Sequence, residues 1–350
     1  MRKFILVCIA ACLYYSGLVK LALWWQRRSG RILVVLNYHR ATGGDIRRHL
    51  LYLSRHYRIL QLEAALEELY TPHKDKQKTW DQRIPLVLTF DDGYHDNYTH
   101  VFTLARELRI PITLFLIPGY VESGDRFWWL EGKRFAHSTL LNEAVIDGRI
   151  YYLDFTKGRK ALAQAIDNRL RHARSVEERE AFLTSACEKL AFPDRVMAED
   201  DDERPLTWAE VREMEESGWV SFGAHTMHHP MLAYLADPQE LRREVEECRT
   251  VLERQLGHSV RTFAYPVGQM KYLGDTVIQA VRQAGYNWAF TTLYGFNTPE
   301  SDPYLLRRIE VSVSQHWLVM VAEAAGLWYF FSRLRKVPFV HRHFTKTSWN

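Results

Sequence analysis

The sequence predicts an α/β protein in which parallel strands alternate with crossover helices, in sufficient number to close into a (β/α) barrel. Two observations predict this class. Short apolar runs alternate with helical patterns along most of the 350 residues. Carboxylates and imidazoles directly follow two of these runs, at the strand ends where such folds build active sites. The composition, 47% hydrophobic and 25% charged, is that of an ordinary globular protein.

Each expected strand is a short apolar run with β-branched or aromatic residues, and each expected helix shows apolar residues three and four apart. The strands are expected at Ile32–Asn37, Tyr57–Leu62, Leu86–Phe90, Ile112–Ile117, Val220–Ala224, Thr262–Tyr265, Trp288–Thr291 and Arg308–Val313. The helices are expected at Asp45–Ser54, Leu62–Tyr70, Asn97–Leu108, Thr207–Ser217, Pro238–Leu256 and Leu273–Ala284.

The N-terminal segment, residues 1–28, carries a long apolar run. From Phe4 to Trp25 the chain is apolar apart from Lys20 and a few small or hydroxyl residues, and about 20 apolar residues span a bilayer. No Ala-x-Ala cleavage pattern follows, so we expect an uncleaved membrane-anchor helix. The alternative is an amphipathic helix that lies on the membrane or on the domain itself. Basic residues flank both sides of the run, which leaves the orientation open.

Two further segments depart from the strand–helix alternation. Residues 125–202 form an expected insertion with helical patterns at Arg159–Ala173 and Val176–Leu190. The insertion either shapes a substrate cleft or is a solvated excursion. In the C-terminal segment, residues 314–350, the apolar run Trp317–Phe331 is too short to span a bilayer. We expect it to be the last barrel helix, with an interfacial helix before a basic tail as the alternative.

Two strand ends carry the residues that indicate chemistry. One strand ends in Asp91-Asp92-Gly93, and another is followed by His225 and His229. One carboxylate with two imidazoles is a three-ligand metal set that leaves positions open for water and substrate. The second carboxylate then remains free to act as a base. This combination indicates metal-assisted hydrolysis.

The spacing of the histidines leaves one ambiguity. His225 and His229 are four residues apart, which places both side chains on one face of a helical turn. Pro230 disfavours helical backbone at His229, so the pair is expected on a loop or at a helix start. By spacing alone, His228 is a rival third ligand.

Three motifs in order resemble those of the polysaccharide deacetylases, the NodB-homology enzymes also called family 4 carbohydrate esterases. They are Thr89-Phe90-Asp91-Asp92-Gly93, His225-Thr226-x-x-His229 and Arg261-Thr262-Phe263-Ala264-Tyr265-Pro266. The resemblance covers roughly residues 32–313, which would be the catalytic domain. It implies a distorted (β/α)7-type barrel.

The resemblance also implies roles for individual residues. Asp92, His225 and His229 would hold the metal, and Asp91 would be the general base. Arg261 would pair with this base and orient it; otherwise Arg261 forms a surface ion pair. The backbone N–H near Tyr94 would help to stabilise the oxyanion.

The proton donor is where the sequence departs from the family. The expected late Leu-x-His motif is missing, because the last strand contains no histidine before His316. Tyr38-His39 ends the first strand and resembles a branch of the family that acts on exopolysaccharide amino sugars. We therefore expect His39 to be the acid or a close neighbour of the site, the alternative being a structural histidine.

Substrate contacts are expected from residues near the third motif and the strand that follows it. Tyr265 and Pro266 would line the cleft together with Tyr94. Trp288 would form a wall of the acetyl pocket, although core packing explains this residue equally well.

The sequence thus predicts a metal-dependent hydrolase that removes N-acetyl groups from amino sugars of a cell-surface or exported polysaccharide. Zinc is the expected ion, and cobalt, nickel or manganese would accept the same ligands. The alternatives are a deacylase or deformylase of a lipid-linked sugar, and an inactive glycan-binding protein. A net charge of +4 without a basic block argues against nucleic acid. The membrane is an expected partner, with the catalytic domain outside the cytoplasm or, alternatively, on the cytoplasmic side.

Overall fold

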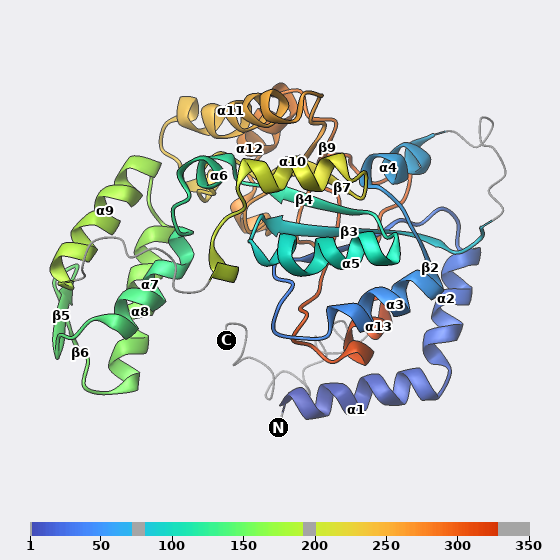
Figure 1. The fold of residues 1–350 in the computed structure, drawn as a ribbon, viewed down its shortest axis with the longest axis horizontal. Helices are drawn as coiled ribbons and strands as arrows, with labels where there is room; N and C mark the ends of the chain where they lie inside the picture. Colours follow the sequence, from blue (N-terminus) through green and yellow to red (C-terminus); the bar gives the residue numbers. More distant parts are fainter. Residues whose placement is uncertain (1, 72–80, 192–200, 328–350) are drawn as a thin grey trace.

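A computed structural model describes residues 2–71, 81–191 and 201–327 of the chain (Figure 1). Its centre is a curled parallel sheet. Neighbouring strands run in the order β10 (Ile309–Glu310), β1 (Val34–Tyr38), β3 (Ile84–Asp92), β4 (Ile112–Leu116), β7 (Val220–Ala224), β8 (Thr262–Ala264) and β9 (Trp288–Phe290). The short strand β2 (Tyr57–Ile59) pairs with the start of β3. All eight expected strands are present, which confirms an α/β fold with a parallel sheet.

The two edges of the sheet approach each other through the segment that leads into β10. Leu306 exchanges backbone hydrogen bonds with Ala289 and Thr291 at β9, at 3.0 and 2.8 Å. A few residues later, Ile309 and Glu310 pair with β1. The sheet therefore curls round an interior, as the barrel prediction requires. The strands near this junction, β9 and β10, are only three and two residues long.

The interior of the sheet is apolar at one end and polar at the other. Val35, Val87, Phe115 and Phe290 form a buried cluster with the leucines of α4 (Leu62–Tyr70). Side chains alternate along a strand with a period of two, so Thr89 and Asp91 lie on the same face of β3 as Val87. The polar layer consequently forms at the carboxyl ends of the strands, above the apolar layer.

Helices cover the outside of the sheet (Figure 1). They are α3 (Ile46–His56), α5 (Thr103–Leu108), α10 (Trp208–Glu216), α11 (Pro238–Leu256) and α12 (Asp275–Gln283). A π-helical turn, Asn97–Phe102, precedes α5, so that the expected helix over 97–108 begins irregularly. Helix α10 begins with a capping box between Thr207 and Glu210, which satisfies two backbone N–H groups at its start.

The insertion forms a separate lobe beside the sheet (Figure 1). It follows α6 (Pro118–Ser123) and contains α7 (Trp128–Ser138), α8 (Thr156–Arg171) and α9 (Val176–Lys189). An antiparallel hairpin, β5 (Glu143–Ile146) with β6 (Arg149–Tyr152), lies between α7 and α8. The lobe has its own apolar cluster, which includes Phe135, Leu162 and Leu183. The helices at 159–173 and 176–190 were expected; the hairpin was not.

The N-terminal apolar run does not form the single anchor helix that we expected. It consists of α1 (Arg2–Tyr15) and α2 (Leu18–Arg28), which are separated at Ser16–Gly17 and bent by 65°. Gly17 adopts φ +84°, a backbone conformation that ends the first helix without a steric penalty. Within the described ranges, this bent pair alone has the length and apolar composition of a membrane span, and no single helix does.

The C-terminal apolar run forms α13 (Trp317–Ala324), which packs against α1 and α3. Seven of its eight residues are buried, in agreement with the expected final helix of the domain. The rest of the expected basic tail, residues 328–350, lies outside the described residues.

Candidate active site

The parallel register brings the two motif-bearing strand ends together. Asp92 at the end of β3 lies opposite Leu116 of β4, and Leu116 lies opposite Ala224 of β7. The next residue, His225, donates its backbone N–H to the Leu116 carbonyl at 2.8 Å. Residues that are more than a hundred positions apart in the sequence thus meet at the same rim of the sheet.

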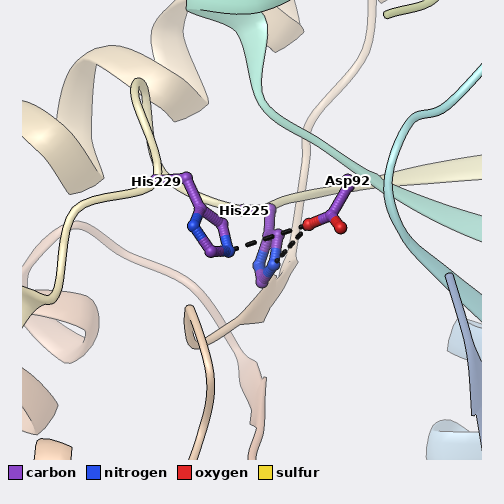
Figure 2. A group of neighbouring side chains, drawn as sticks. All are labelled: Asp92, His225 and His229. Atoms are coloured by element: carbon purple, nitrogen blue, oxygen red, sulfur yellow. Dashed lines mark ion pairs between the residues drawn. The ribbon is translucent and has the colours of Figure 1, made fainter. Parts of the chain in front are cut away.

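Asp92, His225 and His229 form a compact group of three buried side chains (Figure 2). The Asp92 Oδ1 atom is 3.5 Å from His225 Nε2 and 3.7 Å from His229 Nε2. One ligand atom from each side chain lies within 4.8 Å of the other two. Figure 2 shows the carboxylate and both rings pointing toward one another.

Local backbone conformation sets the direction of these side chains. Asp92, Thr226 and His229 all have positive φ, at 75°, 66° and 56°. Few non-glycine residues adopt this region, and those that do often mark functional sites. The Thr226 hydroxyl accepts the His229 backbone N–H at 2.9 Å, so the turn is held closed. His225 and His229 therefore lie on a loop, as Pro230 predicted.

Hydrogen bonding also determines which imidazole nitrogen faces the centre. His225 Nδ1 lies 2.7 Å from the backbone carbonyl of Ala264, an acceptor that requires the proton on this nitrogen. Nε2 is then left unprotonated, with its lone pair facing the centre of the three-residue group. A histidine fixed in this way by a carbonyl is typical of metal ligands in proteins.

Burial and charge act in opposite directions on the three groups. Burial alone would raise the pKa of Asp92, but the neighbouring imidazoles outweigh it and the pKa is lowered. Burial would lower the pKa of His225, but the neighbouring carboxylates of Asp92 and Asp91 outweigh it and the pKa is raised. For His229 burial dominates and lowers the pKa to about 3, so this ring is neutral at physiological pH. A neutral imidazole is the form that binds a cation.

The donor set fits a divalent metal ion. Asp92 Oδ1 is buried and has no hydrogen-bond partner among the described residues. An unpaired buried carboxylate oxygen is costly, and a cation would satisfy it. Two nitrogens and one oxygen suit zinc and neighbouring transition metals, and they argue against calcium, which prefers oxygen ligands.

Asp91 does not join this group; instead it is held by Arg308. Two guanidinium nitrogens donate to its two carboxylate oxygens at 2.7 and 2.8 Å. Asn37 Nδ2 donates a further hydrogen bond at 3.1 Å. Burial alone would raise the pKa of Asp91, but the Arg308 charge outweighs it and holds the pKa well below its usual range. Asp91 is therefore an ionised carboxylate in a fixed orientation.

Arg308 is the residue that the sequence reasoning missed. It directly precedes β10 and points into the sheet interior, where its side chain is fully buried. Its Nε also donates to the Thr291 carbonyl at 3.0 Å, which connects the β9 edge to the base. A charged residue beside an apolar strand was the available signal, and it was not used.

The expectation that Arg261 orients Asp91 is corrected by the structure. Arg261 pairs with Glu63 and Glu67 of α4, and about one third of its side chain is exposed. The reason is position along the strand: Arg261 precedes β8, whereas the site lies beyond its far end, roughly 10 Å away at 3.3 Å per residue. The alternative, a surface ion pair, is the correct one.

Three of the expected substrate-binding residues are placed in the interior. Tyr265 is fully buried and donates its hydroxyl to the Tyr304 carbonyl at 3.1 Å. Trp288 begins β9 at the opposite rim, packed beneath the Arg261 guanidinium. Pro266 is also buried and accepts a backbone hydrogen bond from Gly268. The side chains of Tyr265 and Trp288 therefore pack in the domain and do not line a cleft.

His39 and Tyr94 do lie at the site. The His39 side chain follows β1 and is close enough for its charge to lower the pKa of both Asp91 and Asp92. Tyr94 follows the Asp-Asp-Gly turn, and its backbone N–H donates no hydrogen bond within the described chain. His316, the other histidine considered for the acid, instead caps α13 by accepting the Leu318 N–H at 3.3 Å.

The insertion contacts the site directly, so it is not merely a solvated excursion. Trp128 Nε1 donates to the His229 carbonyl at 3.0 Å, and Arg179 donates to the His228 carbonyl at 2.9 Å. The Trp129 ring lies 4.5 Å from the His229 ring, and its Nε1 donates to the Tyr94 hydroxyl at 2.7 Å. The lobe thus supports the histidine loop and forms one wall of the site.

His228, the rival ligand, turns away from the group. Its Nδ1 lies 2.6 Å from Glu244 Oε1, and its backbone N–H donates to the same carboxylate at 2.8 Å. Glu244 is buried in α11, so it anchors the loop between His225 and His229. Gly119 permits this arrangement, because a Cβ there would lie 2.5 Å from the Met227 carbonyl.

An ionised carboxylate held by arginine thus lies beside an Asp-His-His group at the carboxyl rim of a parallel sheet, an arrangement that suits metal-assisted hydrolysis. The comparisons with known proteins identify the family. The profile of the polysaccharide deacetylase family matches residues 80–289, and the chain belongs to this family.

Individual relatives agree with the family assignment. YxkH of Bacillus subtilis (strain 168), which is named among the polysaccharide deacetylases, is 27% identical over 298 residues, which are 83% of this chain and 75% of that protein. The solved structure of IcaB from Ammonifex degensii covers 85% of this chain and 98% of its own, with a TM-score of 0.54 and 19% identity. The Streptococcus pyogenes deacetylase PplD covers 85% and 99%, with a TM-score of 0.53 and 16% identity. These two structures show that the fold is shared.

Proposed function

We propose that this protein is a metal-dependent N-deacetylase that acts on amino sugars of a cell-surface or exported polysaccharide. One observation carries the proposal: the two adjacent carboxylates have different partners. Asp92 faces His225 and His229, whereas Asp91 accepts hydrogen bonds from Arg308 and Asn37. This division suits metal-assisted hydrolysis, in which one carboxylate helps to hold the ion and the other remains available as a base.

The chemistry of amide hydrolysis assigns a task to each group. A divalent ion held by Asp92, His225 and His229 would act as a Lewis acid and would lower the pKa of a water molecule. Asp91 accepts the proton of the attacking water, and Arg308 keeps this carboxylate oriented and ionised. The Tyr94 backbone N–H donates to the oxygen on which negative charge develops. His39 donates the proton that the departing nitrogen requires.

The insertion determines the shape of the place where the substrate reacts. Trp129 is partly exposed beside His229 and offers an apolar surface against which an acetyl group or a sugar ring can pack. The Trp129–Tyr94 hydrogen bond couples this wall to the turn that carries the proposed oxyanion donor. Substrate choice would therefore depend on the lobe at 125–202 as well as on the family motifs.

The proposal is tested by acetate release from N-acetylglucosamine oligomers and polymers, compared with N-acetylated and N-formylated lipid-linked sugars. We expect metal-stripped protein to be inactive and zinc, cobalt, nickel or manganese to restore acetate release. Asp91→Asn should bind the metal normally without turnover. Full activity after rigorous metal removal would refute the mechanism, and turnover of lipid-linked sugars alone would refute the polysaccharide substrate.

A further inference from the structure

The helix pair α1–α2 has two faces of different character. The inner face packs on the domain: Leu13, Val19 and Leu23 are buried, and the Tyr14 ring lies 5.2 Å from the Trp317 ring of α13. Gln26 Nε2 donates to the Ala325 carbonyl at 2.8 Å, in a buried position. The pair is therefore an integrated part of the domain surface (Figure 1).

The outer face of the same pair is apolar and exposed. Thirteen large hydrophobic side chains are exposed in the described chain, and seven of them lie in this helix pair. They are Phe4, Ile5, Tyr15, Leu18, Leu21, Trp24 and Trp25. Trp25 is 67% exposed and Tyr15 is 76% exposed. Such a concentration on a soluble surface usually marks an interaction site.

The charge around this face has a single sign. Residues 1–31 contain six lysines and arginines and no acidic residue. Lys20, Arg27 and Arg28 are exposed on α2, and the Arg28 guanidinium lies 4.2 Å from the centre of the Trp24 ring. Tryptophan and tyrosine with adjacent basic residues are the composition that suits the headgroup region of a bilayer.

We propose that the outer face of α1–α2 docks on an anionic lipid surface, with both helices lying flat in the interface instead of spanning the bilayer. A helix of 14 residues is about 21 Å long, which is short of a hydrocarbon core of about 30 Å. A span would also require the 65° bend to open and the inner face to leave α13.

The charges favour lipid over a second copy of the chain as the occupant. Two copies joined through this face would bring Lys20, Arg27 and Arg28 close to their own equivalents, without an acidic residue in the segment to compensate. Anionic headgroups supply the opposite charge. The inference is independent of the proposed catalytic chemistry, because none of the site residues belongs to this pair.

The test is co-sedimentation of the full-length protein with vesicles of phosphatidylcholine alone or with added phosphatidylglycerol. Leu21→Glu/Trp25→Glu should lower vesicle binding more than tenfold. Arg27→Gln/Arg28→Gln should lower binding to the anionic vesicles by about 25-fold, since each basic residue near such a surface contributes about fivefold. Leu140→Glu/Ile150→Glu is the matched control, because these side chains are also apolar and more than half exposed but lie in the insertion, and it should bind like the wild type.

Further measurements separate the alternatives. Alkaline carbonate should release the protein from membranes, whereas retention would show a spanning segment and overturn the proposal. A chain that ends at residue 327 should still bind; loss of binding would place the lipid contact in the C-terminal residues and overturn it. Equal losses of vesicle binding in Leu21→Glu/Trp25→Glu and in the control variant would overturn the proposal as well. So would a dimer of the wild-type protein that Leu21→Glu/Trp25→Glu converts to monomer. Unchanged acetate release from soluble oligomers verifies that the variants are folded.

Discussion

Replacing Arg308 with methionine should damage the protein far more than the same replacement at Arg261. The two arginines have the same chemistry but different surroundings. Arg308 is buried and forms two short hydrogen bonds to Asp91, whereas Arg261 forms ion pairs with Glu63 and Glu67 at the surface. Comparing the two variants therefore shows which arginine sets the orientation and the pKa of Asp91.

The magnitude follows from burial. Removing one partner of a buried ion pair typically costs about 3–5 kcal/mol, because the other charge is left without compensation. An exposed pair contributes about 0–1 kcal/mol. Chemical denaturation should therefore show a large loss of unfolding free energy for Arg308→Met and a small one for Arg261→Met. Arg308→Lys keeps the charge but not the two parallel bonds, and it should fall between them.

The pH dependence has a definite sign. Arg308 lowers the folded-state pKa of Asp91, so this carboxylate stabilises the protein above its unfolded pKa and loses that contribution as the pH falls through the folded pKa. Without Arg308, burial becomes the dominant influence and raises the pKa of Asp91. The acid limb of kcat/KM should then move to higher pH in Arg308→Lys or Arg308→Met.

The assay is acetate release from an N-acetylglucosamine oligomer between pH 4 and 9, with bound metal measured on the same preparations. Arg308 variants should show the shifted acid limb with metal content near that of the wild type, and Arg261→Met should show the wild-type profile. A shifted profile in Arg261→Met, together with an unshifted one in the Arg308 variants, would refute this reasoning.

Four other outcomes are expected. Asp92→Ala should lose both metal and turnover, while Asp91→Asn should keep the metal and lose about 10²-fold or more in kcat; elemental analysis with kinetics would expose reversed roles. His39→Ala should lower kcat with metal retained while His316→Ala turns over normally, and equal activity of both variants would place the acid elsewhere. Trp129→Phe keeps a ring beside His229 but loses the hydrogen bond to the Tyr94 hydroxyl. We therefore expect kcat to fall severalfold and KM to change less; an unchanged kcat would contradict a link between Trp129 and the turn that carries Tyr94. Burial lowers the pKa of His49 to about 4, so stability should fall by on the order of 3 kcal/mol as the pH drops from about 6.5 to about 4, and His49→Phe should flatten this part of the stability curve.

Local patterns were sufficient to predict the strands and the group formed by Asp92, His225 and His229. A strand such as Val220–Ala224 is recognised from five residues, because its apolar side chains and its neighbours set its conformation locally. Asp92, His225 and His229 follow such strands directly, and the parallel register then brings strand ends to one rim. For these residues, a place just after a strand in the sequence therefore predicts a place at the rim of the sheet.

Arg308, Trp128, Trp129 and Arg179 could not be found in that way. Each reaches the site from an element whose place depends on packing: the β10 edge for Arg308, and the insertion lobe for the other three. Arg261 is the opposite case: its motif predicted a contact with Asp91, but the motif does not show that Arg261 lies at the end of β8 away from the site. A long side chain can span several residues' length, so its partner is chosen by the tertiary structure.

The α/β fold, the adjacent carboxylates, the two nearby histidines and the apolar N-terminus could be predicted from the sequence. The contact of Arg308 with Asp91, the contacts of the insertion with the site, and the packing of the broken N-terminal run on α13 emerged from the folded structure. The physical reason is the range of the interactions. Strand and turn conformations depend on neighbouring residues, whereas buried ion pairs and helix packing join segments whose proximity is settled only when the whole core is formed.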